Sequence, residues 1–280
     1  MALPFVCLEH SDNVMTTDPG SYDFGPDIAM PWLQFGFPQL PEAGSPAHYS
    51  ILERWLRDCD EHHLNCRPAQ SSGPPLPTRL IDVGLKYAPF VKLFETQQGD
   101  DIKYLALSHP WGSPPHFCTY PNNVKQHKDG IEISKLPKTF QHAVTVTREL
   151  GLRYLWIDSI CIIQGPSGDF DYEAKRMEDV FSYAYCVLAA SSARGQSDGL
   201  IQQLANRKQL AIHRGHRAPL YVCEFLDNFD EHVLGSYLNQ RGWVYQERAL
   251  ARRTIYFTTR QTYWECGIGV RCETLTKMQK

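Results

Sequence analysis

A glutamate follows a tryptophan by four positions in the segment 241–247, and the residue types and the spacing are both suited to chemistry. Positions i and i+4 lie on one face of a helix, so Trp243 and Glu247 would stack there. A carboxylate held in this way can stabilise a positively charged transition state. The alternative is a surface helix in which Trp243 anchors the core and Glu247 is solvated. The segment alone leaves both interpretations open.

Alternating strands and helices from residue 100 onward would position this glutamate. Apolar runs predict strands at 103–108, 154–157, 186–190 and 253–257. One helix is predicted from Pro137 to Leu150, and a second, capped by Asp169 or Asp171, has an apolar face formed by Met177, Val180, Phe181 and Ala184. This alternation is typical of a parallel sheet with right-handed crossovers. Ligands of such sheets lie outside the carboxyl ends of the strands, where Ser108, Trp111, Asp158 and Ser191 fall.

The remaining parts of the chain have weaker patterns. Residues 1–48 predict an irregular lead-in, residues 49–65 a helix and residues 71–77 a linker. Strands are predicted at 78–83 and 90–96, and within the weakly patterned stretch 192–240 only at 210–212 and 220–222. We therefore expect an amino-terminal extension of residues 1–77, followed by a domain of residues 78–280.

Composition excludes several classes of partner. The chain has 280 residues and is 42% hydrophobic, which suffices for one large domain. Its net charge of −3 and its lack of a basic block disfavour nucleic acid. Apolar runs are shorter than the roughly 18 residues of a membrane helix, and no signal peptide is evident. Nine scattered cysteines are typical of reduced thiols. We expect a cytoplasmic protein without membrane or nucleic-acid partners.

A short pattern before the linker has the ligand types of zinc. Cys59, His63 and Cys66 form C-x3-H-x2-C, but a closed structural site needs four ligands. The candidates for the fourth have no diagnostic spacing: Cys7, His10 and His62. No metal is therefore the main expectation, with zinc at these residues as the alternative. A serine or cysteine hydrolase is disfavoured, because there is no G-x-S-x-G motif and no histidine with an evident partner.

Four sequence blocks occur in order along the chain, at 104–112, 136–140, 155–164 and 241–247. Together they resemble the fungal heterokaryon incompatibility (HET) domain. Residues 177–184 and 263–266 are similar to its intermediate and closing motifs, and 79–83 to its usual lead-in strand. His109 departs from the pattern, because an aromatic residue is more usual there. The resemblance implies a fungal cytosolic protein that triggers cell death on non-self recognition.

HET domains resemble TIR domains distantly, and TIR domains often hydrolyse NAD. The resemblance implies an α/β fold, a flavodoxin/TIR-like mainly parallel sheet flanked by helices, with an N-terminal helical and β-hairpin extension. The TIR catalytic helix carries Trp and Glu at the spacing of Trp243 and Glu247, which implies Glu247 as the catalytic residue. NAD would be the substrate, and no cofactor is expected. Cleavage of the nicotinamide–ribose bond passes through an oxocarbenium-like state that this carboxylate would stabilise.

The candidate substrate-binding residues are Ser108, Trp111, Gly112, Asp158, Arg241, Trp243 and Gln246. Trp243 or Trp111 would stack on a ring of the substrate. Asp158 would bind ribose or position water, or would instead cap a turn. Ser108 and Gly112 would bring backbone near a phosphate, although the glycine-rich phosphate-loop pattern is missing.

Two functions remain in competition at this point. The first is an NAD glycohydrolase switched on by self-association. The second is a non-enzymatic module that passes the death signal to a partner through the same surface. The expected partners are NAD, further copies of the chain and an upstream recognition protein.

Overall fold

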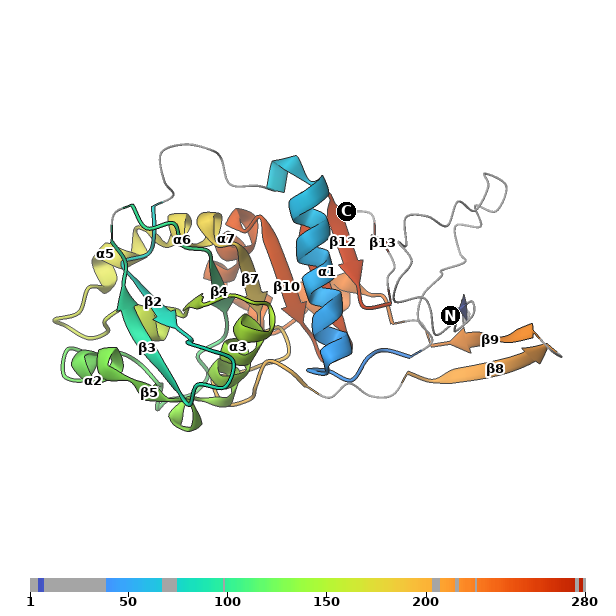
Figure 1. Ribbon diagram of the computed structural model, residues 1–280, viewed down its shortest axis with the longest axis horizontal. Coiled ribbons are helices and arrows are strands. Elements are labelled where there is room, and N and C mark those ends of the chain that lie inside the picture. The colour runs from blue at the N-terminus through green and yellow to red at the C-terminus, as the bar shows by residue number, and fades with distance from the viewer. Residues whose placement is uncertain are drawn as a thin grey trace.

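The computed structural model is built around one large mixed sheet (Figure 1). It describes residues 5–7, 39–66, 75–97, 99–202, 207–214, 217–224, 226–274 and 277–278. Ten strands form the sheet in the order β13-β12-β11-β10-β7-β4-β6-β2-β3-β5. Most of the predicted lead-in, 1–48, and part of the predicted linker, 71–77, lie outside the described residues.

The middle of this sheet is parallel. Its strands are β4 (Tyr104–Ser108), β6 (Tyr154–Trp156), β7 (Cys186–Ala189) and β10 (Arg253–Phe257). They pair side by side in the order β10-β7-β4-β6, all parallel. Every residue of β4, β7 and β10 is buried, as expected of strands covered on both faces. The predicted parallel sheet flanked by helices is confirmed.

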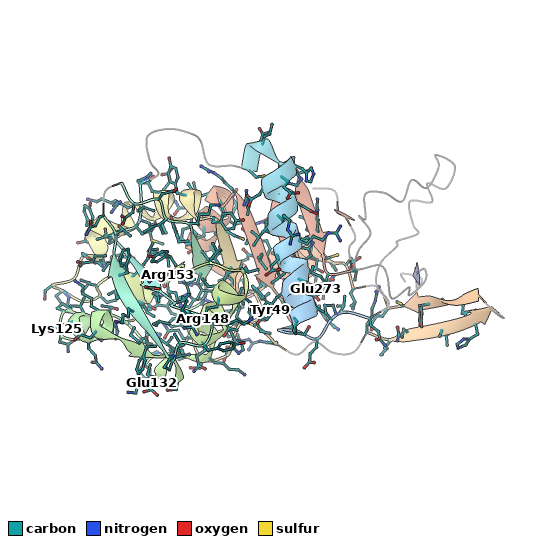
Figure 2. All side chains as sticks on the ribbon, in the orientation of Figure 1. Tyr49, Lys125, Glu132, Arg148, Arg153 and Glu273 are labelled. Carbon is teal, nitrogen blue, oxygen red and sulfur yellow. The ribbon has the colours of Figure 1, made fainter. Side chains whose placement is uncertain are left out.

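Antiparallel strands extend the sheet on both sides. Beyond β6 lie β2 (Arg79–Asp82), β3 (Phe90–Glu95) and β5 (Ile131–Glu132). Beyond β10 lie β11 (Thr262–Cys266), β12 (Gly269–Cys272) and β13 (Lys277–Met278). The predicted β2–β3 hairpin is confirmed, and its pairing with β6 makes it continuous with the parallel strands. Arg148 secures its turn by donating to the carbonyls of Val83 and Ala88 (Figure 2).

Helices cover both faces of the β10–β12 part. Helix α1 (Pro46–His62) lies across one face, where the ring of Trp55 is 6.4 Å from that of Trp264. Tyr263 directly precedes Trp264 in β11. Its side chain therefore points to the opposite face, because side chains alternate along a strand. There it packs in a cluster with Val244 of α7 (Gly242–Leu250). Helix α7 therefore lies on the face opposite α1, in contact with α6 (Met177–Tyr183).

Helix α3 (Lys138–Glu149) lies between β4 and β6 in the chain. The remaining helical elements are short: α2 (Val124–Asp129), α4 (Asp158–Cys161), α5 (Phe170–Ala174), the 3-10 turns Leu64–Cys66, Ile133–Lys135 and Leu238–Gln240, and the π-helix Asp230–Leu234. A separate sheet of order β1-β9-β8 contains β1 (Phe5–Cys7), β8 (Gln209–Arg214) and β9 (Arg217–Cys223). The two strands predicted within 192–240 are thereby confirmed. No helix in the described part of the chain has the length and apolar character needed to cross a bilayer.

Two local predictions are wrong. The helix expected after Asp169 is divided into α5 and α6, although its apolar residues Val180 and Phe181 are buried as predicted. Asp169 is the N-cap residue of α5, as predicted, but its carboxylate makes no capping bond, because it accepts from the Ile163 N–H at 2.8 Å and pairs with Arg79. Pro137 is the N-cap residue of α3 rather than part of its first turn.

Candidate functional site

The carboxyl ends of β4 and β7 form the point where the strand order of the sheet reverses. The chain leaves β4 for β6 on one side and later returns to β7 on the other side. Ser108 ends β4 and lies directly opposite Ala189 of β7. In open α/β sheets such a switch point is the usual place for a ligand.

Glu247 reaches this switch point from α7. Its Oε2 accepts a hydrogen bond from the hydroxyl of Ser108, whose side chain is buried. Glu247 is half-buried, and the surrounding protein raises its pKa to about 7, chiefly by removing water from the carboxylate. The charge of Asp158 raises this pKa further, while the Ser108 hydrogen bond and Arg241 oppose the shift. Both protonation states are thus populated near neutral pH.

Helix α7 is held in place by the closing motif. Arg248 donates from Nε and Nη2 to the two carboxylate oxygens of Glu265 in β11, both at 3.0 Å. The hydroxyl of Tyr256 in β10 donates to the same carboxylate at 2.6 Å. This bidentate, buried arrangement ties α7 to the β10–β11 hairpin and so positions the neighbouring Glu247.

Asp158 lies at the start of α4, immediately after β6. Its Oδ2 accepts from the indole Nε1 of Trp111 at 2.7 Å, and its Oδ1 accepts from the backbone N–H of Ser159 at 2.6 Å. The carboxylate therefore orients the Trp111 ring. It also accepts from the neighbouring backbone N–H, which is the contact expected if Asp158 caps a turn. Its charge still acts on Glu247.

Arg241 connects the loop after β4 to the start of α7. Its Nη1 donates to the carbonyl of His109 at 2.7 Å. The His109 ring is buried and lies edge-on to Phe140 at 5.0 Å, the packing expected of an aromatic residue. Burial lowers the pKa of His109, so the ring is neutral at pH 7. His109 therefore packs as the more usual aromatic residue would at this position.

Gly112 lets two loops approach closely. Its φ is +77°, and a Cβ there would lie 2.7 Å from the Cα of Gly195, a distance that real Cβ atoms do not tolerate. The loop after β4 thus packs backbone to backbone against the loop after β7.

A small hollow adjoins Glu247. Its cavity volume is about 10 Å³, room for about one water molecule and far below the about 300–1,000 Å³ of typical small-molecule pockets. Its lining comes from β4, β7, the 3-10 turn Leu238–Gln240, α7 and β10: Ser108, Val187, Ala189, Leu238, Asn239, Val244, Glu247, Arg248, Thr254 and Tyr256. Asn239 and Arg248 were missed by the sequence-based prediction. Asn239 lies in a stretch without periodicity, and no local signal marks it.

The other predicted residues are distributed as follows. Trp243 and Glu247 share α7, as predicted, but the side chain of Trp243 lies outside the described part of the structure. Gln246 is exposed. Cys59, His63 and Cys66 gather with Cys266 in a separate cluster.

None of the three expected fourth ligands joins that cluster among the described side chains. His62 is exposed and bonds through Nδ1 to the Asp58 carbonyl at 3.1 Å. His10 and the side chain of Cys7 lie outside the described residues.

Comparison with known families gives one match. The family model described as Heterokaryon incompatibility protein (HET) matches residues 104–247. Neither the curated proteins nor the solved structures give a match. The matched region begins with β4 and ends at Glu247, so it contains Ser108, Asp158 and the whole switch point. The chain belongs to the heterokaryon incompatibility (HET) family.

Proposed function

We propose that this HET-family protein acts in heterokaryon incompatibility and cell death by cleaving the nicotinamide–ribose bond of NAD, with Glu247 as the essential carboxylate. Family membership indicates the role in incompatibility and cell death. The observation that supports the chemistry is the hydrogen bond from Ser108 to Glu247, a partly desolvated carboxylate at the switch point. Perturbed carboxylates of this kind are concentrated at functional sites.

The strand order supports a flavodoxin/TIR-like relationship. Numbered along the chain, the parallel strands β6-β4-β7-β10 have the order 2-1-3-4, which is the start of the flavodoxin-like order. Such folds bind nucleotides at the carboxyl ends of the first and third strands. In this chain those ends carry Ser108 and Ala189.

The proposed reaction needs one carboxylate. The C1′–N bond to nicotinamide breaks with its electron pair going to the neutral leaving group, so no acid is required. The cationic ribosyl centre lies beside Glu247, whose charge stabilises it. A water oxygen adds to C1′, and its proton passes to Glu247, since a pKa near 7 suits a general base at neutral pH.

The size of the hollow supports activation by self-association. A cavity of about 10 Å³ is too small for the nicotinamide ring, so the site must open before the dinucleotide binds. The dinucleotide would then lie over α7, where Tyr245 and Gln246 are exposed. We infer that contact with a second copy opens or completes the site.

A non-enzymatic signalling module is the second candidate. What favours it is that Asp158 and Arg241 are already engaged by Trp111, Ser159 and His109. In that case the exposed surface of α7 would bind a partner and Glu247 would have no chemical role.

One experiment separates the two candidates. Nicotinamide release from NAD is measured with purified protein, concentrated to favour assembly, while toxicity and cellular NAD are followed on expression in fungal cells. Release together with toxicity and NAD loss supports the enzyme. Toxicity with constant cellular NAD, and no release by folded, assembled protein, supports the module.

The pH dependence of the reaction is predictable from Glu247. Because burial raises its pKa to about 7, the catalytic carboxylate form increases as pH rises through that value. We expect kcat/KM for nicotinamide release to rise about ten-fold per pH unit below about pH 7 and to level off above it. A profile measured from about pH 5.5 to 8.5 that stays flat would contradict this assignment.

Removing the Ser108 hydroxyl should displace this profile. The hydrogen bond from Ser108 lowers the pKa of Glu247, so Ser108→Ala should move the midpoint of the pH profile to higher pH. Ser191→Ala is the matched control, because Ser191 is also a buried serine just beyond a parallel strand and its Oγ has no partner among the described residues. Equal midpoints in both variants would show that Ser108 does not act on Glu247.

A further inference from the structure

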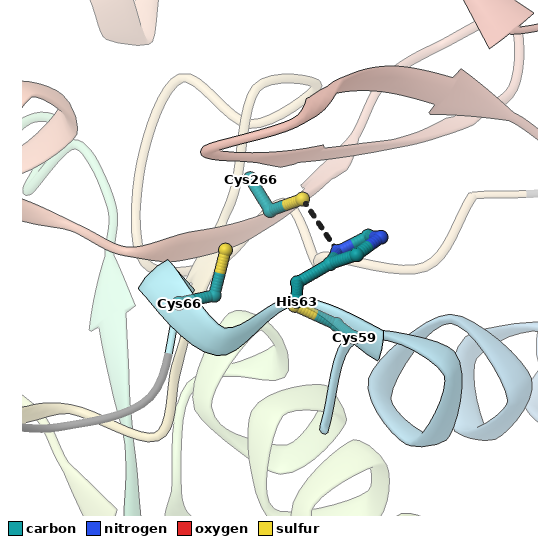
Figure 3. A group of neighbouring side chains, drawn as sticks. All are labelled: Cys59, His63, Cys66 and Cys266. Carbon is teal, nitrogen blue, oxygen red and sulfur yellow. Dashed lines mark hydrogen bonds between the residues drawn. The ribbon is translucent and has the colours of Figure 1, made fainter. Parts of the chain in front are cut away.

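Three cysteines and one histidine meet where α1 contacts the β11–β12 hairpin (Figure 3). Cys59 lies in the last turn of α1, His63 follows that helix and Cys66 ends the next 3-10 turn. Cys266 is the last residue of β11. Their ligand atoms all lie within 4.8 Å of one another, and Figure 3 shows the side chains converging. Cys59, Cys66 and Cys266 are buried and His63 is half-buried.

The register of α1 on β11 creates this cluster. Thr262, Trp264 and Cys266 share one face of β11, because side chains alternate along a strand. His48 of α1 bonds to Thr262 at 2.9 Å, and Trp55 packs on Trp264. The next turn of α1 therefore carries Cys59 to Cys266. Local sequence could not reveal Cys266, because it joins from the far end of the chain.

The geometry points to a structural zinc site formed by Cys59, His63, Cys66 and Cys266. Structural zinc prefers four sulfur and nitrogen ligands in a tetrahedron, and one histidine with three cysteines is an established combination. Zinc bonds of about 2.3 Å to sulfur and about 2.0 Å to nitrogen place those two ligand atoms about 3.5 Å apart in a tetrahedron. The His63 Nδ1 and the Cys266 Sγ are 3.5 Å apart.

The surroundings of the cluster supply a compensating charge. Zinc with three thiolates and one neutral imidazole has a net charge of about −1. Arg253 lies directly opposite Cys266 in the β10–β11 pairing, and only 3% of its surface is exposed. Its Nη2 pairs with Asp60 at 2.7 Å and lies 3.4 Å from the carbonyl oxygen of Cys66.

The other nitrogens of this guanidinium support the same conclusion. Its Nε and Nη1 are buried and have no hydrogen-bond partner among the described residues. Leaving such donors buried is costly unless negative charge lies beside them. A zinc–thiolate group at Cys266 would provide that charge.

The site joins two segments that flank the matched HET region. Cys59, His63 and Cys66 precede residues 104–247, and Cys266 follows them. Zinc there would clamp α1 onto the hairpin that also carries Glu265, the partner of Arg248 in α7. Metal binding to preorganised ligands contributes directly to folding free energy, so the clamp should stabilise the whole sheet.

The test measures zinc bound to the purified full chain. Protein is made in zinc-supplemented medium, purified under reducing conditions and analysed by inductively coupled plasma mass spectrometry. We expect about one zinc per chain in the wild type, and at least about ten-fold less in His63→Ala and Cys266→Ser. Cys118→Ser is the control, because Cys118 is a buried free cysteine outside the cluster, and it should retain the metal.

Two further measurements keep the result decisive if a variant fails to fold. A strong chelator should lower the Tm of the wild type, and added Zn²⁺ should restore it. Co²⁺ in place of zinc should give the visible and near-ultraviolet absorption of tetrahedral cobalt–thiolate coordination. Folded wild type without zinc or cobalt binding would overturn the proposal. So would equal zinc in His63→Ala and wild type.

Discussion

Glu247→Gln is expected to reduce nicotinamide release from NAD by about 10²–10³-fold or more, the cost of removing one preorganised electrostatic group from a transition state. Glutamine keeps the size of the side chain and still accepts from Ser108, but it has no negative charge for the ribosyl centre. Chromatographic quantification of nicotinamide over time, with assembled protein, measures the effect.

The control for this variant is Glu178→Gln, which removes an exposed glutamate from the neighbouring α6 and should leave the rate unchanged.

Folding provides a second control. The folded-state pKa of Glu247 lies above its ordinary value of 4.5, so the folded state binds more protons between that value and about pH 7. The wild type therefore loses stability as pH rises through that window, and Glu247→Gln should have an equal or higher Tm at pH 8. Undiminished nicotinamide release by a folded Glu247→Gln would remove this residue from the mechanism.

Gly112→Ala is expected to destabilise the protein by about 2–4 kcal/mol, the combined cost of a left-handed conformation and an overpacked contact. A Cβ at this position would lie 2.7 Å from the Cα of Gly195 and 3.2 Å from the carbonyl oxygen of Arg194. Both contacts are with backbone, so neither can be relieved by rotating a side chain. Urea unfolding followed by circular dichroism measures the change.

Gly151→Ala is the matched variant for this prediction. Its φ of +70° is close to the +77° of Gly112, but a Cβ at Gly151 meets nothing within 4 Å. Only the conformational cost applies there, about 1–2 kcal/mol. Equal losses of stability in the two variants would mean that the loops after β4 and β7 can separate without cost.

The elements of the fold were largely predictable from local pattern. Continuous apolar runs identified β4, β6, β7 and β10 because a strand covered on both faces carries apolar side chains on both. The family blocks also placed Ser108 and Asp158 near the carboxyl ends of β4 and β6, and Glu247 on the helix that precedes β10. Asp169 occupies the predicted N-cap position, but the pattern that predicts a helix cap does not reveal that Ile163 and Arg79 engage its carboxylate.

The sequence by itself determined the secondary structure of the parallel core, the family and the carboxylate on which the proposed chemistry depends. Tertiary structure alone decided which side chains meet: Ser108 with Glu247, Arg248 with Glu265, and Cys266 with Cys59, His63 and Cys66. The physical reason is that periodicity reports which face of an element is buried, whereas these contacts depend on strand order and helix register. Both are set by packing between segments far apart in the chain.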